Sequence, residues 1–530
     1  MTPVIDPFDP FDPIPVPTKP PPARRGVRVR RVRVRVGPGY PWYSLLTRPA
    51  TGVRPRLMHQ LYPAVALPRI TYGVDIWYTP PSKPTGSTCN KGSVGILRNL
   101  QKIQLIATLA ITGTLRSSPN DYVDIHARVL PMDLALLKAC HNAVIRSLTL
   151  PHTNPIHQVM HEAQRRPPST HLGPLNRLLE LFKLRQSKFE TIQPAITINR
   201  TINFSTFVDS TREDSITSES NDDADFKVFS DGSGLDNGIG AAAIMYEKGR
   251  VRPIKSLQAF LGTPDKHNTY EAEAIGAILA LWIMSNTPET IGRRVTLYID
   301  NQSIVKAILE PKATSGQYLL SALRMAANGV GCRLSVRWIS SHSKVKGNED
   351  VDKLAKKAAE GRSSARARLP HILRGPLPIS ASAHKQHFNS SLKTKWSTLW
   401  DTSPRKTRIA QFGEDFPFSA FLKRLDLLTR KQSSIILQLR CGHFPLNVYL
   451  HRIGKSETNS CQACLDDEEG QAHPETINHF IFDCPAYKEA REELVNDIDR
   501  DNLHFIDIMA NTNYMKALTT FINRTRRFRD

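Results

Sequence analysis

The stretch Phe226-Lys227-Val228-Phe229-Ser230-Asp231-Gly232-Ser233-Gly234 decides the fold of this protein. Its first five residues predict a short buried strand, which ends at the carboxylate of Asp231. Asp236-Asn237-Gly238 then predicts a hairpin, because Asn-Gly accepts the positive φ angles of a tight turn. The small apolar run Ile239 to Tyr246 predicts the returning strand, and Val251 to Leu261 predicts a third. The segment therefore begins as a three-stranded meander.

A helix with two acidic residues is expected after this meander. Asn268 is a candidate N-cap, and Glu271 three residues later completes a capping-box pair. Glu273 shares a helix face with Gly276 and Ala280, and this small face lets the helix lie close to a sheet. Glu271 and Glu273 compete as chemical groups. We favour Glu273, because helix capping already explains Glu271.

The same alternation of strands and helices continues to about residue 360. The predicted elements are strands at Val295–Ile299 and Arg333–Ile339, and helices at Val305–Leu309, around Tyr318–Ala327 and from about Asn348. Parallel strands need helical crossovers, and these are present in the order βββαβααβα. The pattern predicts an α/β fold with a mixed five-stranded sheet and covering helices.

Acidic residues gather at the ends of these strands and helices: Asp231, Glu273, Asp300, and either Asp350 or Asp352. Buried carboxylates at close range repel each other. Divalent cations relieve that repulsion, and hard oxygen ligands suit Mg²⁺ or Mn²⁺. Two such ions about 4 Å apart can activate a water and stabilise the leaving oxygen of a phosphodiester. The pattern therefore predicts phosphodiester hydrolysis without a protein nucleophile.

Five blocks of sequence resemble the type 1 ribonuclease H family. They are Asp231-Gly232-Ser233, Tyr270-Glu271-Ala272-Glu273-Ala274, Tyr298-Ile299-Asp300-Asn301-Gln302-Ser303, Trp338-Ile339-Ser340-Ser341-His342 and Gly347-Asn348-Glu349-Asp350-Val351-Asp352-Lys353-Leu354-Ala355. The resemblance implies an RNA–DNA hybrid ribonuclease with two Mg²⁺ or Mn²⁺ ions. The metal-binding catalytic carboxylates it implies are Asp231, Glu273, Asp300 and Asp352, with Asp350 as the rival for the fourth place.

The resemblance also implies roles for residues around the carboxylates. His342 matches the histidine of a mobile loop that helps product or metal to leave. Gly232, Ser233, Asn237 and Gln302 match positions that contact the hybrid in its minor groove. Selectivity for RNA would then come from contacts to 2′-hydroxyl groups across that groove.

A cysteine and histidine cluster near the C-terminus predicts a structural zinc site. Cys461, Cys464, His479 and Cys484 have the spacing C-x2-C-x14-H-x4-C, which suits tetrahedral Zn²⁺ with no open position. His473 is an alternative third ligand. Two further residues lie close enough in sequence to compete: Cys441 and His443.

Composition and low-complexity stretches divide the chain. The expected parts are a disordered Pro-rich and basic arm (1–40), a helical region (41–190), an acidic Ser/Thr-rich linker expected to be disordered (191–225), the ribonuclease H domain (226–362), a second linker (363–383) and a helical region with the zinc module (384–530). The segments around 61–77 and 480–485 resemble the C-terminal part of non-LTR retrotransposon polyproteins, at the end of the reverse transcriptase and in the tail. The polymerase signature Tyr/Phe-x-Asp-Asp is missing upstream, so no reverse transcriptase activity is expected.

The net charge of +22 points to a polyanionic partner, first nucleic acid and second an anionic membrane surface. No run of 18 apolar residues predicts a membrane span. Seven cysteines are too few for a disulfide scaffold, which favours a reducing compartment such as cytosol or nucleus. Two functions remain: an active hybrid-specific ribonuclease, or a nucleic-acid-binding remnant of a mobile element whose site is unused.

Overall fold

The computed structural model describes residues 52–83, 88, 90–165, 173–194, 202–341, 344–465, 473–498 and 503–528. The predicted arm at residues 1–40 lies outside these ranges. Within them, no helix is both long and apolar enough to cross a bilayer.

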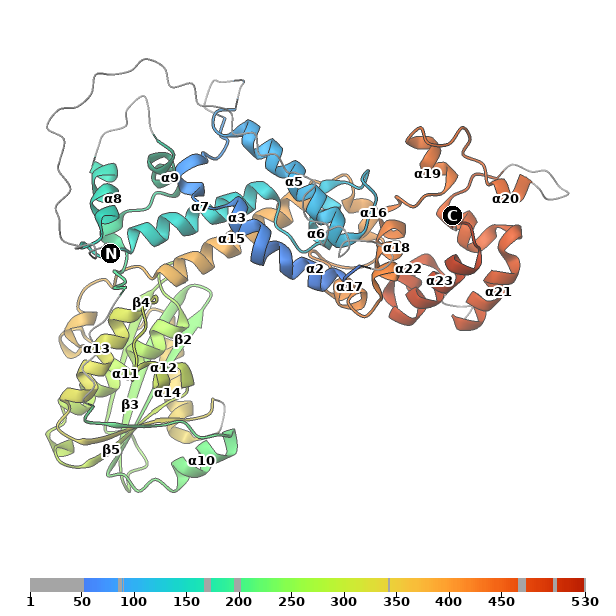
Figure 1. Ribbon diagram of the computed structural model, residues 1–530. Coiled ribbons are helices and arrows are strands. Elements are labelled where there is room, and N and C mark those ends of the chain that lie inside the picture. The colour runs from blue at the N-terminus through green and yellow to red at the C-terminus, as the bar shows by residue number, and fades with distance from the viewer. Residues whose placement is uncertain are drawn as a thin grey trace, which may run out of the picture. The chain divides into compact units, whose positions relative to one another are not determined.

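A six-stranded sheet forms the centre of the segment 202–362 (Figure 1). Its strands are β1 (Ser205–Phe207), β2 (Phe226–Leu235), β3 (Gly238–Glu247), β4 (Lys255–Gly262), β5 (Arg294–Ile299) and β6 (Arg333–Trp338), in the spatial order β1-β6-β5-β2-β3-β4. The meander β2-β3-β4 is antiparallel, whereas β2, β5, β6 and β1 run parallel. The predicted mixed α/β fold is confirmed, with six strands in place of five.

Helices pack on both faces of this sheet. They are α11 (Thr269–Ser285), α12 (Gln302–Ala307), α13 (Gln317–Gly329) and α14 (Lys346–Ala359), with a 3₁₀ turn at Pro288–Thr290. On one face, Val228 and its neighbours form a core with α11 and α13. On the other face, Phe229 packs with Val351 and Ala355 of α14. Successive residues of β2 thus serve opposite cores, as strand alternation requires.

The stretch expected to be a disordered acidic linker is partly folded onto the domain. Residues Ser205–Phe207 form β1, which pairs with β6 at the edge of the sheet, and Arg212–Ser220 form α10 with Thr211 as its N-cap. The expectation of disorder was wrong for this part, because it counted the acidic residues as unpaired. Asp223 instead forms an ion pair with Arg294, and Glu219 forms one with Lys227.

The N-terminal part of the described chain is helical, as predicted. Its elements are α2 (Pro55–Leu61), a π-helical turn (Tyr62–Ala66), α3 (Leu67–Ile70), α4 (Val74–Trp77), α5 (Val94–Thr112), α6 (Asn120–His126), α7 (Met132–Leu148), α8 (Pro155–Arg165), α9 (Pro174–Phe182) and a 3₁₀ turn (Gln186–Lys188).

The C-terminal part is also helical. After 3₁₀ turns at Arg366–Arg368 and His371–Leu373 come α15 (Ala381–Asp401), α16 (Lys406–Ala410), α17 (Ser419–Leu425), α18 (Arg430–Cys441), α19 (Asn447–Arg452), α20 (Gln462–Leu465), a π-helical turn (His479–Asp483), a 3₁₀ turn (Pro485–Tyr487), α21 (Lys488–Asp497), α22 (Phe505–Ala510) and α23 (Thr512–Arg524).

Helices from the two sides of the sheet domain in sequence share one hydrophobic core. Tyr122 and Ile125 of α6 belong to the same buried cluster as Phe421 of α17 and Phe521 of α23. The hydroxyl of Tyr122 donates to the carbonyl oxygen of Leu437 at 2.9 Å. The regions 41–190 and 384–530, divided by sequence composition, therefore pack together in part.

Candidate active site and Cys/His cluster

The register of two parallel strands brings the first two carboxylates together. Ser230 of β2 pairs with Ile299 of β5. The next residue along each of these two segments is an aspartate, so Asp231 and Asp300 lie next to each other. Asp231 lies two positions after Phe229 and therefore faces the α14 side. The sequence predicted a carboxylate at each strand end. This is confirmed for Asp300, which follows β5, but Asp231 lies inside β2, because β2 continues to Leu235 in its pairing with β3.

Glu273 reaches this strand end from α11, which lies very close to β2. A side chain at Gly232 would collide with the backbone of Ala272 and Glu273. The glycine thus allows the close approach of α11 to β2. Glu271 instead caps the helix. Its N–H donates to Asn268 Oδ1 at 3.0 Å, and its Oε2 accepts from the Asn268 N–H at 3.1 Å, so the predicted capping box is confirmed.

The fourth carboxylate lies on α14, where Asp350 and Asp352 were rivals. Asp350 accepts a 2.7 Å hydrogen bond from the hydroxyl of Tyr246. Asp352 pairs with Lys356 at 2.7 Å, and its charge raises the pKa of Asp231. Two residues apart on a helix, the two side chains point in different directions. The structure therefore places Asp352 on the side of the carboxylate cluster.

The cluster carries strong mutual repulsion. Burial, followed by the charges of Asp300 and Asp352, raises the pKa of Asp231 to about 7. Burial, with Asp300 and Asp231 next, raises the pKa of Glu273 well above its ordinary range. Carboxylates held this way favour either protonation or a bound cation.

The residues present fit divalent metal ions. Asp231, Glu273 and Asp300 each offer one oxygen, and these oxygens all lie within 4.8 Å of one another. Among the described residues, Glu273 Oε2 is buried with no hydrogen-bond partner. A buried acceptor without a donor is costly unless a ligand satisfies it, and an all-oxygen donor set suits Mg²⁺ or Mn²⁺.

The other predicted site residues are distributed around this cluster. Ser233 lies on β2 two residues beyond Asp231, Asn237 is exposed in the β2–β3 turn, and Gln302 is the first residue of α12, two residues after Asp300. Their contacts to substrate remain predictions. His342 lies outside the described residues.

Two supporting contacts were not predicted from the sequence. The indole Nε1 of Trp338 donates to the backbone oxygen of Asp300 at 3.0 Å, and the hydroxyl of Tyr298 donates to Asp222 Oδ2 at 2.7 Å. Both aromatic residues stood inside the quoted family blocks. Their polar atoms were the available signal, because a buried Trp or Tyr needs a hydrogen-bond partner.

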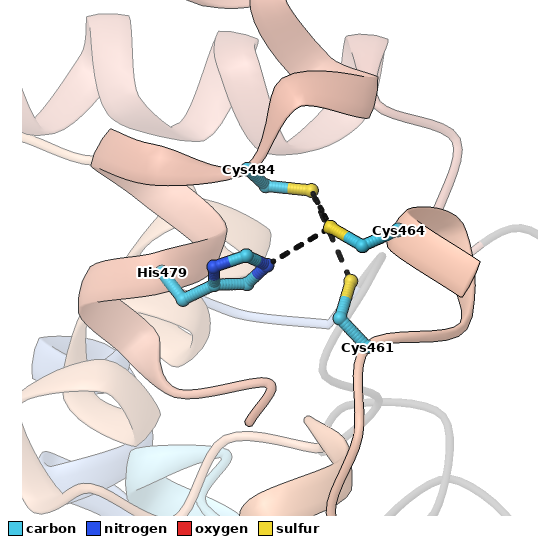
Figure 2. Close-up of side chains that lie close together, drawn as sticks. All are labelled: Cys461, Cys464, His479 and Cys484. Carbon is cyan, nitrogen blue, oxygen red and sulfur yellow. Dashed lines mark hydrogen bonds between the residues drawn. The ribbon is translucent and has the colours of Figure 1, made fainter. Parts of the chain in front are cut away.

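The predicted Cys/His residues converge in the C-terminal region (Figure 2). Cys461, Cys464, His479 and Cys484 are all buried, and their ligand atoms lie within 4.8 Å of one another. The Sγ atom of Cys464 is 3.4 Å from Cys484 Sγ and 3.3 Å from His479 Nε2, and Cys461 Sγ is 3.8 Å from Cys484 Sγ. Tetrahedral ligands with a Zn–S bond of 2.3 Å stand roughly 3.8 Å apart. The four side chains therefore fit one tetrahedral metal ion.

The competing ligands lie outside this group of four. His473 stacks on the His479 ring and offers its backbone oxygen to the Cys461 N–H at 2.7 Å. His443 stacks against Tyr449 instead. Burial and hydrogen bonding with Cys484 and Cys461 raise the pKa of the Cys464 thiol, a strain that a bound cation would relieve.

The comparison with protein families now identifies the sheet domain. Residues 223–360 match the family model of RNase H. The chain therefore carries an RNase H domain, and the predicted enzyme class is confirmed. The matched range contains all four carboxylates and the whole sheet except β1. No match was found among curated proteins.

Solved structures similar to the chain are also RNase H proteins. The N-terminal RNase H domain of rv2228c from Mycobacterium tuberculosis, fused to maltose binding protein, is 17% identical over 26% of this chain and 95% of its own (TM-score 0.22). RNase H1 from Halobacterium salinarum is 15% identical over 26% and 98% (TM-score 0.22). LC11-RNase H1 in complex with RNA/DNA hybrid is 14% identical over 26% and 97% (TM-score 0.22).

Proposed function

We propose that the RNase H domain hydrolyses the RNA strand of RNA–DNA hybrids with two divalent metal ions. The observation that carries this proposal is the convergence of Asp231, Glu273 and Asp300 within 4.8 Å, with the charge of Asp352 close enough to raise the pKa of Asp231 after burial and Asp300. No structural need explains a buried acidic cluster of this kind, which destabilises the protein unless cations neutralise it.

The chain's own residues would prepare the site in three ways. Asp231, Glu273, Asp300 and Asp352 would hold the ions. Gly232 lets the α11 backbone approach closely and so places Glu273, and Lys356 balances the charge of Asp352. When bound, the ions would supply an activated water and stabilise the leaving oxygen of the phosphodiester.

The substrate contacts of this proposal lie beside the carboxylates in sequence. Gly232 and Ser233 follow Asp231, and Gln302 follows Asp300 by two residues. Small and polar groups at these positions suit close approach to a minor groove and hydrogen bonds to 2′-hydroxyls. The RNA strand, which alone carries those hydroxyls, would thereby be selected.

The test is cleavage of a labelled RNA–DNA hybrid by the full chain in Mg²⁺ or Mn²⁺, with Asp231→Asn as control. We expect cleavage of the RNA strand by the unaltered protein and a loss of at least about a thousandfold in the variant, since metal charge stabilisation is worth several kcal/mol. Binding of hybrid without cleavage by the unaltered protein would support the alternative, an unused remnant. Equal cleavage by both proteins would contradict the assigned site.

We also propose that the Cys/His cluster holds one structural Zn²⁺. The thiol spacing and complete burial of all four side chains support a closed site. Metal analysis of the purified chain should find one zinc per molecule.

The retrotransposon context is a further proposal. It rests on the sequence order of helical region, RNase H domain and Cys/His module. Long-read sequencing of transcripts should place this coding region in frame with a polymerase signature in related element copies. Transcripts in which it consistently joins unrelated host exons would argue against this context.

A further inference from the structure

We propose that β1 and α10 act as a clamp that positions Asp300 and the end of β6 for catalysis. We call residues 202–225 the clamp. This inference rests on the proposed function and concerns positioning residues, which act through the carboxylates. The clamp precedes or overlaps only the first residues of the segment that matches the RNase H family, 223–360.

The first contact joins α10 to the chain directly after β6. The Ser340 N–H donates to Ser215 Oγ at 3.2 Å, and Ser215 is fully buried. Arg212 Nη2 donates to the backbone oxygen of Ser341 at 2.7 Å. A buried backbone N–H that loses its acceptor is destabilised, so Ser215 fixes where the chain leaves the sheet.

The end of β6 is in turn linked to a catalytic carboxylate. Trp338 donates its indole N–H to the backbone oxygen of Asp300 at 3.0 Å, and the Ile339 N–H donates to the Ile299 oxygen at 3.0 Å. A shift of β6 at Ser340 is therefore transmitted to Asp300 within two residues. Metal ligands tolerate little displacement, because misplacement by about 1 Å weakens catalysis strongly.

A second contact holds β5 from the other end of the clamp. Tyr298, which is buried and lies two residues before Asp300, donates its hydroxyl to Asp222 Oδ2 at 2.7 Å. At the start of β5, the Arg294 N–H donates to Asp225 Oδ2 at 3.0 Å. The clamp thus contacts both neighbouring strands, β5 and β6, that lead to the site.

The clamp also faces the start of α14. Ile216, Glu219 and Ser220 line one side of a cleft of about 640 Å³, and Lys344 to Gly347 line another. Asp352 lies on the helix that begins there. Exposed ion pairs on the clamp contribute little individually, so the argument rests on the hydrogen bonds of Ser215 and Tyr298.

The test compares Ser215→Ala and Tyr298→Phe with Thr217→Ala in the full chain. Thr217 is the matched control, because its exposed hydroxyl bonds within α10 to the Glu213 oxygen. We expect the Ser340 amide to exchange about tenfold faster in Ser215→Ala. For Ser215→Ala and Tyr298→Phe, which each remove one contact of the clamp, kcat on the hybrid should fall about three- to tenfold with KM within twofold, while Thr217→Ala matches the unaltered protein.

In a protein that cuts the hybrid, two kinetic results would overturn the clamp. One is an unchanged kcat in Ser215→Ala despite faster exchange at Ser340. The other is an equal loss in Thr217→Ala. A protein that cuts no hybrid before any substitution contradicts the proposed function instead. In that case, exchange at Ser340 in Ser215→Ala still tests whether the clamp holds β6, and unchanged exchange would refute it.

Discussion

The carboxylate cluster and the Cys/His cluster both fit metal ions, but they are built in opposite ways. The carboxylates stand at the edge of a large sheet domain with cores on both faces. Cys461, Cys464 and Cys484 form a small buried cluster, against which Ala463 and Tyr487 pack among the residues that the structure describes. Asp300 is half-exposed, whereas all four Cys/His residues are buried.

The carboxylate cluster is therefore a site that depends on an already stable fold, whereas the Cys/His cluster would help to stabilise the fold around it. Apolar burial already stabilises the sheet domain, which can therefore hold repelling charges ready for a cation and a substrate. In the Cys/His module, Phe480 and Ile481 beside His479 join the large C-terminal core, but the Cys461–Cys464 segment packs mainly against the other cysteine, so metal binding would supply the folding energy of that segment. Loss of metal should then inactivate the first region and unfold the second.

The largest effect is expected from removing zinc ligands. Cys461→Ser combined with Cys464→Ser should remove the zinc and expose the amides of 447–465 and 473–487 to fast exchange, since structural zinc contributes on the order of 10 kcal/mol. The exchange pattern of β2 and β5 should stay unchanged. Metal analysis and hydrogen exchange measure both, with Cys332→Ser, outside the cluster, as control. Retention of zinc by the double variant would show that Cys461 and Cys464 are not zinc ligands.

The next effect separates the two aspartates of α14. Asp352→Asn should lower kcat on the hybrid by about a hundredfold or more, roughly 2.7 kcal/mol, because it weakens metal binding. The kcat of Asp350→Asn should stay within about threefold of the unaltered protein, since Asp350 accepts a hydrogen bond from Tyr246. Steady-state kinetics decide this, and a larger loss in Asp350→Asn would reverse the assignment.

A smaller effect concerns how closely the fold is packed around the carboxylates. Gly232→Ala should lower the free energy of unfolding by about 1–3 kcal/mol, because the new methyl group meets the α11 backbone. It should also displace Glu273. Gly329→Ala, where a methyl group meets nothing within 4 Å, should be neutral or slightly stabilising. Denaturant unfolding measures the stability of both variants. Equal stability would contradict the prediction, because it would show that α11 can move away from the new methyl group.

The smallest effect uses a buried carboxylate outside both clusters as a reference. Burial raises the pKa of Asp124 to about 7, against the hydrogen bond from Gln104. Its contribution to stability is complete below its unfolded pKa, near 4, and is lost as pH rises through 7.

Asp124→Asn should therefore gain stability relative to the unaltered protein between pH 5 and pH 8, by on the order of 1–3 kcal/mol. Thermal unfolding across that range measures the difference. Mg²⁺ should leave it unchanged, in contrast to the carboxylate cluster. A difference that shrinks with rising pH would contradict the assignment of burial as the cause.

Local patterns were sufficient for the core of the domain. The strand that begins at Phe226, the hairpin at Asn237 and the capping box at Asn268 and Glu271 each depend on residues within a few positions, although the strand runs on past Asp231 to Leu235. Turn chemistry, capping and strand alternation act at that range. The CxxC spacing of Cys461 and Cys464 likewise indicated ligand chemistry before any fold was known.

Long-range pairing escaped the same reasoning. The acidic stretch 209–225 has the composition of a solvated linker, but Asp222 and Asp223 find Tyr298 and Arg294 on β5. No local pattern shows that such partners lie nearby in space. The shared core of α6 with α17 and α23 escaped for the same reason.

The sequence by itself determined which residue types meet the metals, their order along the chain and the βββαβααβα sequence of elements. Only the tertiary structure decided that Asp350 bonds to Tyr246 while the charge of Asp352 acts on Asp231, that His479 and not His473 joins the cysteines, and that β1 completes the sheet. The physical reason is that helix phase and strand register depend on packing between distant segments. Local propensity determines where helices and strands form. Packing of their apolar faces against one another then determines in which direction each charged side chain points.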